Sequence, residues 1–247
     1  MRFLNHIFRS RLSSNGIFYT QLKKILGTPP KNMALYQEAF THRSMNLKDA
    51  QGERINYERL EFLGDTMLSS VVSAYIYLKY PKAQEGKLTK LRSKIVSREN
   101  LNNIGQKFDL LSLIIPLNPK ANFGNDILGN LLEALIGALY VDQGYVKCER
   151  FILEKILIQH VDLEHINRSI LSYKSALIEW AQKEKSRLVF QTQKADGLDP
   201  NINYMTQLII NNKPLVKARE VSKKKSEEKA ARRAYFKLGL NHHKELL

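Results

Sequence analysis

The chain has 247 residues, 43% of them hydrophobic, and a formal net charge of +15. Such a composition belongs to a folded protein with a sizeable core and excludes a disordered or fibrous chain. No apolar run reaches the ~18 residues that span a bilayer, and the single cysteine, Cys148, excludes an intrachain disulfide or a Cys-rich zinc site. We therefore expect no membrane association, a reducing compartment, and a buried, unreactive Cys148.

The positive charge is concentrated at the two ends of the chain. Residues 1–37 carry +6 and residues 171–247 carry +8, which leaves only +1 of the total for the middle. A basic protein of this size attracts polyanions by releasing their counterions. The alternative is a surplus of lysine that serves only solubility. The uneven distribution favours ends that contact phosphate and a centre that holds the acidic residues.

The first residues are basic, and a helical pattern follows them. We assign residues 1–18 to a basic N-terminal arm; because this stretch is also amphipathic, an organelle is the alternative to a bacterial cytoplasm. From residue 19 onward, apolar residues recur at spacings of three and four. Helices are predicted at about 56–80, 87–108, 126–141 and 148–159, and they form an all-helical domain over residues 19–160.

A change of period marks a second domain. After a linker over residues 161–171, the pattern predicts a helix at about 173–185, strands at 188–193, 203–210 and 214–221, and a helix at 223–238. Asp196-Gly197 and Asn211-Asn212 supply turns between the strands. The predicted fold class is therefore mostly α, with an all-helical domain followed by a small α+β domain of α-β-β-β-α order over residues 172–241 and a tail over 242–247.

Two of the apolar helices carry acidic or amide side chains at helical spacing. Glu58, Glu61 and Asp65 follow one stripe of the 56–80 helix, and Asn130 and Glu133 lie one turn apart in the 126–141 helix. Carboxylates beside so much apolar surface are costly unless they are paired or bound to a cation. Oxygen ligands from two such helices can converge on a hard cation such as Mg²⁺, which can hydrolyse phosphodiesters.

Structural roles are the alternative for these acids. Arg54 and Arg59 could pair with the carboxylates of the first helix. The second helix weakens this interpretation, because no basic residue occurs between positions 126 and 146. There, the alternative is a buried capping or pairing role for Asn130 and Glu133.

Several motifs in order resemble the ribonuclease III family. Residues 56–68, NYERLEFLGDTML, resemble its signature stretch, and residues 41–44, THRS, resemble the short element before it. Glu85-Gly86 with residues 91–93 resembles the next block, and residues 132–142, LEALIGALYVD, resemble the second acidic helix. Residues 172–240 resemble the double-stranded-RNA-binding domain that bacterial members carry.

The resemblance implies an endoribonuclease that cleaves double-stranded RNA by metal-dependent hydrolysis. The products would carry 5′-phosphate and 3′-hydroxyl ends with short 3′ overhangs, and the substrates would include rRNA precursors and mRNA. It implies Mg²⁺, with Mn²⁺ as a substitute, no small-molecule cofactor, and a homodimer with Phe62 at the interface. The implied site residues are the catalytic Asp65 and Glu133, the metal ligands Glu61, Asp65, Asn130 and Glu133, and the supporting acids Glu58 and Glu85.

One departure from the family pattern concerns activity. Asn130 stands where the family usually has aspartate, so the site would lose one negative charge while keeping an oxygen ligand. We expect weaker magnesium binding rather than an inactive enzyme. The alternative function is a catalytically silent protein that binds double-stranded RNA as a structural or ribosome-associated component. A DNA-binding protein is a distant third, because no recognition helix or zinc site is apparent.

The C-terminal domain carries the predicted RNA contacts. Lys223, Lys224 and Lys225 lie at the start of the last helix, where free amides and the helix dipole favour phosphate. In the family domain such lysines contact the phosphates of A-form RNA. Ile178 and the loop at 199–202 depart from the usual minor-groove contacts. Further RNA contacts are expected from Lys174, Glu179 and Asn201.

Overall fold

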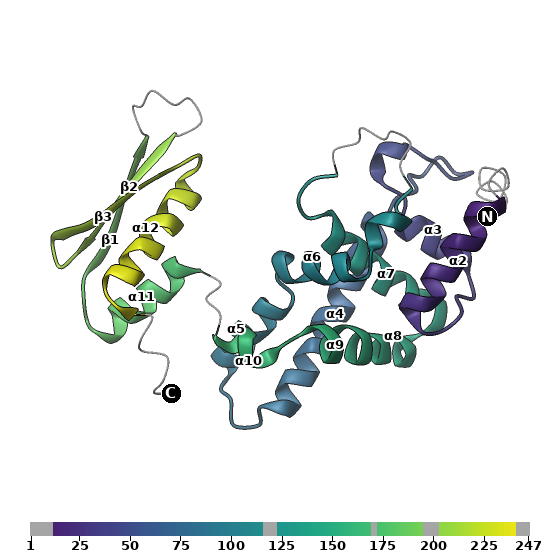
Figure 1. The fold of residues 1–247 in the computed structure, drawn as a ribbon, viewed down its shortest axis with the longest axis horizontal. Coiled ribbons are helices and arrows are strands. Elements are labelled where there is room, and N and C mark those ends of the chain that lie inside the picture. The colour runs from purple at the N-terminus through teal and green to yellow at the C-terminus, as the bar shows by residue number, and fades with distance from the viewer. Residues whose placement is uncertain (1–11, 116–122, 169–171, 195–202, 241–247) are drawn as a thin grey trace. The chain divides into compact units, whose positions relative to one another are not determined.

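The computed structural model describes residues 12–115, 123–168, 172–194 and 203–240 (Figure 1). The chain forms two compact units, Met1–Asn167 and Arg168–Leu247, and each is described by itself. Within the described ranges, no helix is both long and apolar enough to cross a membrane.

The first unit is helical, as its periodicity predicts. The helices expected near 56–80, 126–141 and 148–159 are present with small shifts at their ends, and the last is continued by a π-helical stretch, Ile152–Leu157. Cys148 is buried there, and burial raises the pKa of its thiol to about 12, as expected for an unreactive residue. The helices are α2 (Leu12–Leu26), α3 (Met33–Ala39), α4 (Glu58–Lys79), α5 (Glu85–Ile95), α6 (Arg98–Lys107), α7 (Ile127–Gln143), α8 (Tyr145–Phe151), α9 (Ile158–His160) and α10 (Leu163–Arg168), with 3-10 turns at Arg43–Met45 and Leu110–Leu113.

The single helix predicted over residues 87–108 is wrong. The chain forms two helices there, because α5 ends at Ile95 and Ser97 begins a new helix. The Ser97 backbone is extended, and its side chain accepts a hydrogen bond from the Asn100 N–H at 3.3 Å. This cap interrupts an apolar spacing that otherwise continues across it. The break places Arg98 at the first position of α6.

The ends of the first domain also differ from the expected boundaries. Helix α2 begins at Leu12, inside the range assigned to a basic arm, while residues 1–11 lie outside the described structure. Helix α10 occupies part of the expected linker over 161–171. Asp162 accepts the Glu164 N–H at its start, and Leu163 is buried in the core of the first unit, so both a cap and apolar burial stabilise this short helix.

Helices α4 and α7 lie side by side in the interior with their backbones in close approach (Figure 1). A Cβ atom at Gly64 of α4 would overlap the carbonyl group of Glu133, and one at Gly137 of α7 would overlap the carbonyl group of Leu60. Only glycine permits this approach. It brings the acidic residues of α4 and α7 to the same side of the unit.

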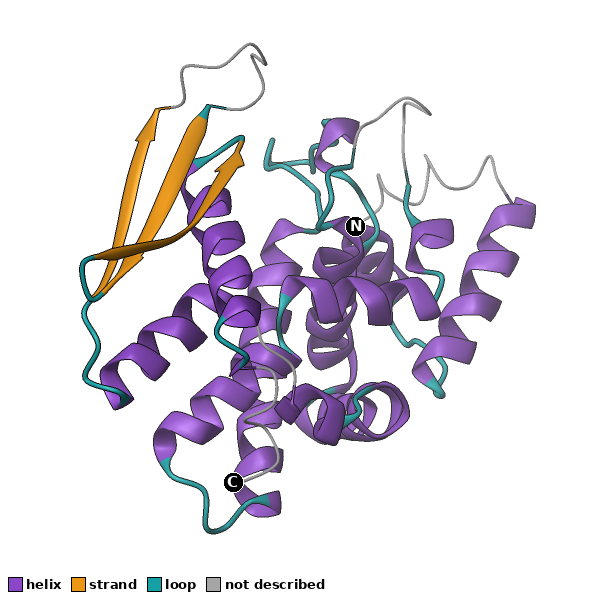
Figure 2. Ribbon diagram, turned by 60° about the vertical axis from the view of Figure 1, so that its left-hand side comes forward, coloured by secondary structure: helices purple, strands orange, loops and turns teal. Residues whose placement is uncertain are grey.

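The second unit has the predicted order of helix, three strands and helix. It comprises α11 (Tyr173–Lys183), β1 (Leu188–Lys194), β2 (Tyr204–Ile210), β3 (Lys213–Glu220) and α12 (Lys223–Lys237). The strands form one antiparallel sheet in the order β1-β2-β3, and Figure 2 shows helices covering one of its faces. The turn at Asn211-Asn212 is present with positive φ at both residues, whereas Asp196-Gly197 lies outside the described structure.

Alanine permits α12 to pack closely on the sheet. Ala230, Ala231 and Ala234 are fully buried against Leu208 of β2 and Leu177 of α11. Trp180 is partly buried against the same core, as expected for a packing residue. The sheet therefore leaves the N-terminus of α12, with its lysines, in solvent.

Candidate active site

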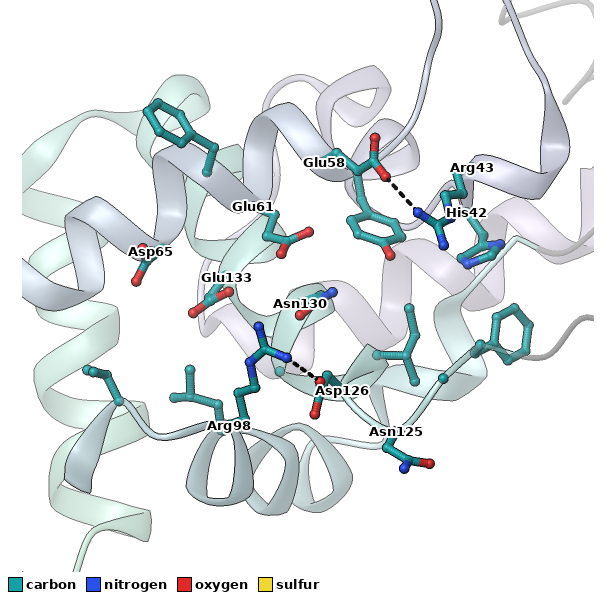
Figure 3. A pocket seen from close by; sticks show the side chains of 18 residues that line it. His42, Arg43, Glu58, Glu61, Asp65, Arg98, Asn125, Asp126, Asn130 and Glu133 are labelled. Atoms are coloured by element: carbon teal, nitrogen blue, oxygen red, sulfur yellow. Dashed lines mark hydrogen bonds and ion pairs between the residues drawn. The ribbon is translucent and has the colours of Figure 1, made fainter. Parts of the chain in front are cut away.

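The acidic stripes of α4 and α7 face one pocket. Its volume is about 860 Å³, and it is lined by Glu58, Glu61 and Asp65 of α4 together with Asn130 and Glu133 of α7 (Figure 3). Five of the predicted site residues, from positions up to 75 apart in sequence, thus meet in one place. The Gly64 and Gly137 contacts produce this meeting, because they set the spacing between the two helices.

The carboxylates in the pocket repel one another. Burial, then the charges of Asp65 and Glu61, raise the pKa of Glu133 to about 8. Burial and Glu58 likewise raise the pKa of Glu61. A pKa of about 8 means that Glu133 retains its proton at neutral pH, because burial and the neighbouring carboxylates outweigh the opposing charge of Arg98. The pocket therefore suits a divalent cation, which would lower the pKa of both glutamates.

The donor set fits a hard cation. The five predicted metal-ligand and supporting residues in the pocket all offer oxygen, which Mg²⁺ and Mn²⁺ prefer. As the side chains stand, no three His, Cys, Asp or Glu residues among those described are close enough together to enclose an ion. The Asn130 carboxamide lies near the Tyr57 hydroxyl, where it partly offsets the elevation of the pKa of Tyr57 by burial.

Besides Tyr57 and Asn125, sequence reasoning missed four ionisable residues of the pocket, His42, Arg43, Arg98 and Asp126. His42 and Arg43 belong to the THRS element, and the Arg43 guanidinium lies 3.6 Å from the Glu58 carboxylate. Arg98 donates to the Asp126 carboxylate at 2.6 Å on the opposite side of the pocket (Figure 3). The THRS motif itself was a signal for His42 and Arg43. For Arg98 and Asp126 the signal was weak. Arg98 begins α6 and Asp126 directly precedes α7, and these two helices meet only in the folded chain.

Glu85 and Phe62 lie differently from the other site residues. Glu85 begins α5, accepts the Thr89 hydroxyl at 2.7 Å, and lines a separate groove of about 590 Å³ with Tyr77 and Leu88. It is not part of the acidic pocket within one chain. Phe62 lies at the edge of that pocket with 77% of its surface exposed.

The predicted RNA contacts of the second unit fall into two groups. Lys223, Lys224 and Lys225 are exposed at the N-terminus of α12, where the Ser222 side chain accepts the Lys225 N–H. The Lys174 ammonium is held by Glu227 at 2.6 Å and lies over the Phe190 ring. It therefore has a structural role besides any contact with RNA. Of the remaining two residues, Glu179 is exposed on α11 and Asn201 lies outside the described structure.

A second acidic residue, unnoticed in the sequence, joins the two helices of this unit. Glu228 of α12 accepts hydrogen bonds from the Ser172 hydroxyl and from the N–H groups of Tyr173 and Lys174 at the start of α11. The free amides of that helix terminus are thereby satisfied. The pairing holds α11 against α12 independently of the sheet.

Fold and site together define a nuclease joined to a module that binds double-stranded RNA. A family described as Ribonuclease-III-like matches residues 32–160, and the Double-stranded RNA binding motif matches residues 173–238. Ribonuclease 3 of Zunongwangia profunda is 47% identical over 238 residues, covering 96% of this chain and 98% of the relative. Ribonuclease 3 of Flavobacterium psychrophilum is 46% identical and covers 96% of each chain.

A solved structure agrees with these relatives. The nuclease domain of ribonuclease III from Campylobacter jejuni has 32% sequence identity and a TM-score of 0.50, and the match covers 58% of this chain and 97% of that one. The chain belongs to the ribonuclease III family. It is an endoribonuclease that acts on double-stranded RNA, and members of its family depend on divalent metal ions.

Proposed function

We propose that the acidic pocket hydrolyses RNA phosphodiesters with Mg²⁺, for which Mn²⁺ can substitute. The observation that carries this proposal is the convergence of Glu61, Asp65 and Glu133 on one pocket, with the pKa of Glu133 raised to about 8. A divalent cation bound among these oxygens would supply the charge that activates water and stabilises the negative charge developing on phosphorus.

The residues of the pocket have different roles in the proposed reaction. Asp65 and Glu133 are the catalytic carboxylates of the proposal, and Glu61 completes the negative charge that attracts the cation. Asn130 adds an oxygen without charge, so the affinity for metal is lower than with a fourth carboxylate. Glu58 supports the site from the rim, where Arg43 pairs with it.

The second unit supplies affinity for the duplex. The exposed lysines 223–225 combine their charge with the amides of the α12 N-terminus, an arrangement that favours phosphate. Such a contact recognises the shape of A-form RNA rather than its sequence. We therefore propose structured RNAs such as rRNA precursors and mRNA as substrates, cut to 5′-phosphate and 3′-hydroxyl ends with short 3′ overhangs, in a bacterial cell like those of the relatives.

We also propose that the enzyme works as a homodimer through α4. Phe62 projects from α4 into solvent, and the mainly apolar groove lined by Tyr77 and Leu88 lies along the same helix. A two-fold axis would let each Phe62 enter the groove of the partner subunit. Glu85 lines that groove, so this pairing would bring it close to Glu61 of the opposite chain.

Cleavage of an end-labelled RNA duplex tests the proposal. Wild-type protein should cut in Mg²⁺ and in Mn²⁺ but not in EDTA, and Glu133→Gln should reduce the rate by at least about 100-fold. Glu154→Gln is the matched control, because Glu154 is exposed on another helix and pairs only with Arg150 among the described residues. Tight duplex binding without cleavage in either metal would instead support the silent RNA-binding alternative, which Asn130 alone favours.

A further inference from the structure

The pocket must accept a polyanion although its lining is mainly acidic. Glu58, Glu61, Asp65, Asp126 and Glu133 all line it. Against these carboxylates, the lining contains two arginines, Arg43 and Arg98. An RNA backbone that reaches the cleavage position therefore meets repulsion that a bound cation relieves only in part. A cationic side chain directed into the pocket would offset the remaining repulsion between the carboxylates and the phosphates.

Arg98 has the geometry for this task. It begins α6, immediately after the Ser97 cap, and Figure 3 shows its side chain directed toward Glu133 and Asn130. Burial and the neighbouring carboxylates raise the pKa of Glu61 and of Glu133. The guanidinium lies near enough to both residues to lower their pKa in part. Yet 82% of the side chain is exposed to solvent. The cation thus faces the open part of the pocket.

Asp126 holds the guanidinium in this orientation and leaves donors free. The hydrogen bond to Asp126 uses the Nη1 of Arg98, at 2.6 Å. Among the described residues no other hydrogen-bond or ion-pair partner of Arg98 is found, so its remaining N–H groups are available to a ligand. A guanidinium with a free edge is suited to paired hydrogen bonds to two phosphate oxygens. Arg43 is less suitable, because it lies beside Glu58 at the far rim, whereas Arg98 lies near Glu61 and Glu133.

We propose that Arg98, oriented by Asp126, binds a phosphate of the RNA backbone beside the cleavage position. Arg98 is then a substrate-binding residue and Asp126 a positioning residue. This inference rests on the proposed nuclease function of the pocket. A purely structural role fits the geometry poorly, because an exposed ion pair contributes little to stability.

The position of Arg98 predicts opposite effects of its charge on RNA binding and on metal binding. Its charge attracts RNA, but the same charge lies beside Glu61 and Glu133 and so opposes the binding of a divalent cation. Removal of the charge should therefore weaken RNA binding and strengthen metal binding at once. A defect in folding would weaken both.

The test compares Arg98→Gln and Arg98→Lys with wild-type protein. Arg150→Gln is the matched control, because Arg150 is also an exposed arginine paired with a carboxylate, Glu154, outside the pocket. For each protein we would measure KM and kcat for duplex cleavage, duplex affinity against salt concentration without divalent metal, and Mn²⁺ binding to RNA-free protein from the loss of the free-ion EPR signal.

For Arg98→Gln we expect KM to rise about 10-fold with a smaller change in kcat, as for the loss of one charge-assisted hydrogen-bonded contact. The slope of log affinity against log salt should fall by about 1. Mn²⁺ should bind about 2- to 5-fold more tightly, by the Coulomb argument above. Arg98→Lys should leave Mn²⁺ binding unchanged and restore KM in part, and Arg150→Gln should match wild type.

Two results would overturn the proposal. If Arg98→Gln matches Arg150→Gln in KM and salt dependence, Arg98 does not contact RNA. If it weakens Mn²⁺ binding and RNA binding together with a lower Tm, its role is structural. A wild-type protein that never cuts, but whose duplex affinity depends on Arg98, would refute the nuclease function of the pocket and still support the phosphate contact.

Discussion

Asn130 lies in the acidic pocket at a position where the resemblance to the family leads us to expect aspartate. The amide offers an oxygen to the pocket but contributes no charge. The neighbouring Glu133 already has a pKa of about 8, because burial and two other carboxylates disfavour its ionised form. A neutral residue at position 130 therefore limits the repulsion in the metal-free pocket and lowers its attraction for a cation.

Asn130→Asp should lower the Mg²⁺ concentration for half-maximal cleavage on the order of 10-fold, since one more charge lies within a few Å of the cation. The measurement is a Mg²⁺ titration of initial rate. Asn125→Asp adds the same charge elsewhere in the lining of the pocket and should shift the titration much less. Equal shifts in both variants would show that a charge at position 130 acts only through the overall negative charge of the pocket and not as a metal ligand.

Asp142 has a structural role that its place in the second motif did not reveal. Its carboxylate accepts the N–H groups of Lys31 and Asn32 and the Tyr36 hydroxyl, at 2.8–2.9 Å. Burial alone would raise the pKa of Asp142, but these hydrogen bonds outweigh it and lower the pKa overall. The end of α7 is thereby tied to the start of α3.

Asp142→Asn should reduce the free energy of unfolding at pH 7 by about 1–3 kcal/mol, the range for hydrogen bonds to a charged group. Because the folded pKa is depressed, this stabilisation is fully present above the unfolded value of about 3.9 and is lost as the pH falls through the folded pKa. Urea unfolding between pH 7 and pH 3 measures the difference. Asp109→Asn, at an exposed position with positive φ that Asn tolerates, should be near neutral. A difference that stays constant to pH 3 would contradict the role of the charge.

At the scale of elements, the contact between α4 and α7 builds the acidic pocket. Glycine in a helix interior is unfavourable by about 1 kcal/mol relative to alanine, so its presence in both helices needs a compensating reason. The reason is backbone contact at Gly64 and Gly137, where any side chain would overlap a carbonyl group of the other helix. The same contact determines how far apart the two acidic stripes lie.

Gly64→Ala should destabilise the first unit by more than about 3 kcal/mol, because the added Cβ forces the helices apart rather than entering free space. Thermal unfolding followed by circular dichroism measures the change. Gly16→Ala in α2 is the matched control, since a Cβ there meets nothing within 4 Å, and helix propensity should make it neutral or slightly stabilising. Similar Tm values for both variants would refute the account.

The N-terminus of α12 is the corresponding element of the second unit. Replacing Lys223, Lys224 and Lys225 by Ala should weaken duplex binding and reduce the slope of log affinity against log salt by about 3, one for each lost phosphate contact. Lys213→Ala is the control, because Lys213 begins β3 whereas the three lysines follow its other end. An unchanged slope in the triple variant would place the RNA elsewhere.

At the scale of the whole molecule, one chain presents the acidic pocket and the groove containing Glu85 as separate features. Pairing of two chains through α4 would join each pocket to the partner's groove. A duplex has two strands, so two pockets in one dimer would allow both strands to be cut in a single encounter. The exposed Phe62 would otherwise be a large aromatic surface left in water.

Phe62→Asp should convert a dimer into a monomer and reduce cleavage strongly while leaving the fold intact, because the side chain is exposed in the single chain. Analytical ultracentrifugation measures the mass. Ile158→Asp replaces another exposed apolar residue, on α9, and should leave the mass unchanged. Dimers that persist in Phe62→Asp would exclude this interface.

The sequence by itself determined most elements and their order, and it identified four of the five acids of the pocket, all except Asp126. Periodicity shows which residues share a face of a helix or strand, so the stripes on α4 and α7 and the α-β-β-β-α order could be predicted. The lysines of α12 could be located for the same reason. Local pattern also misled, since it could not weigh the Ser97 cap against an apolar spacing that continued across it, and it did not show the helix in the expected linker.

Only the tertiary structure decided which faces meet. The approach of α4 to α7 depends on Gly64 and Gly137 acting together, and the ion pair of Arg98 with Asp126 joins two helix starts that are 28 positions apart. The pocket as a unit, the task of Asp142 and the separation of Glu85 from the other acids likewise depend on contacts between distant segments. Spacing along the chain determines which residues are neighbours within one helix or strand. Packing determines which residues of different elements become neighbours. The chemistry of this site depends on neighbours from different elements.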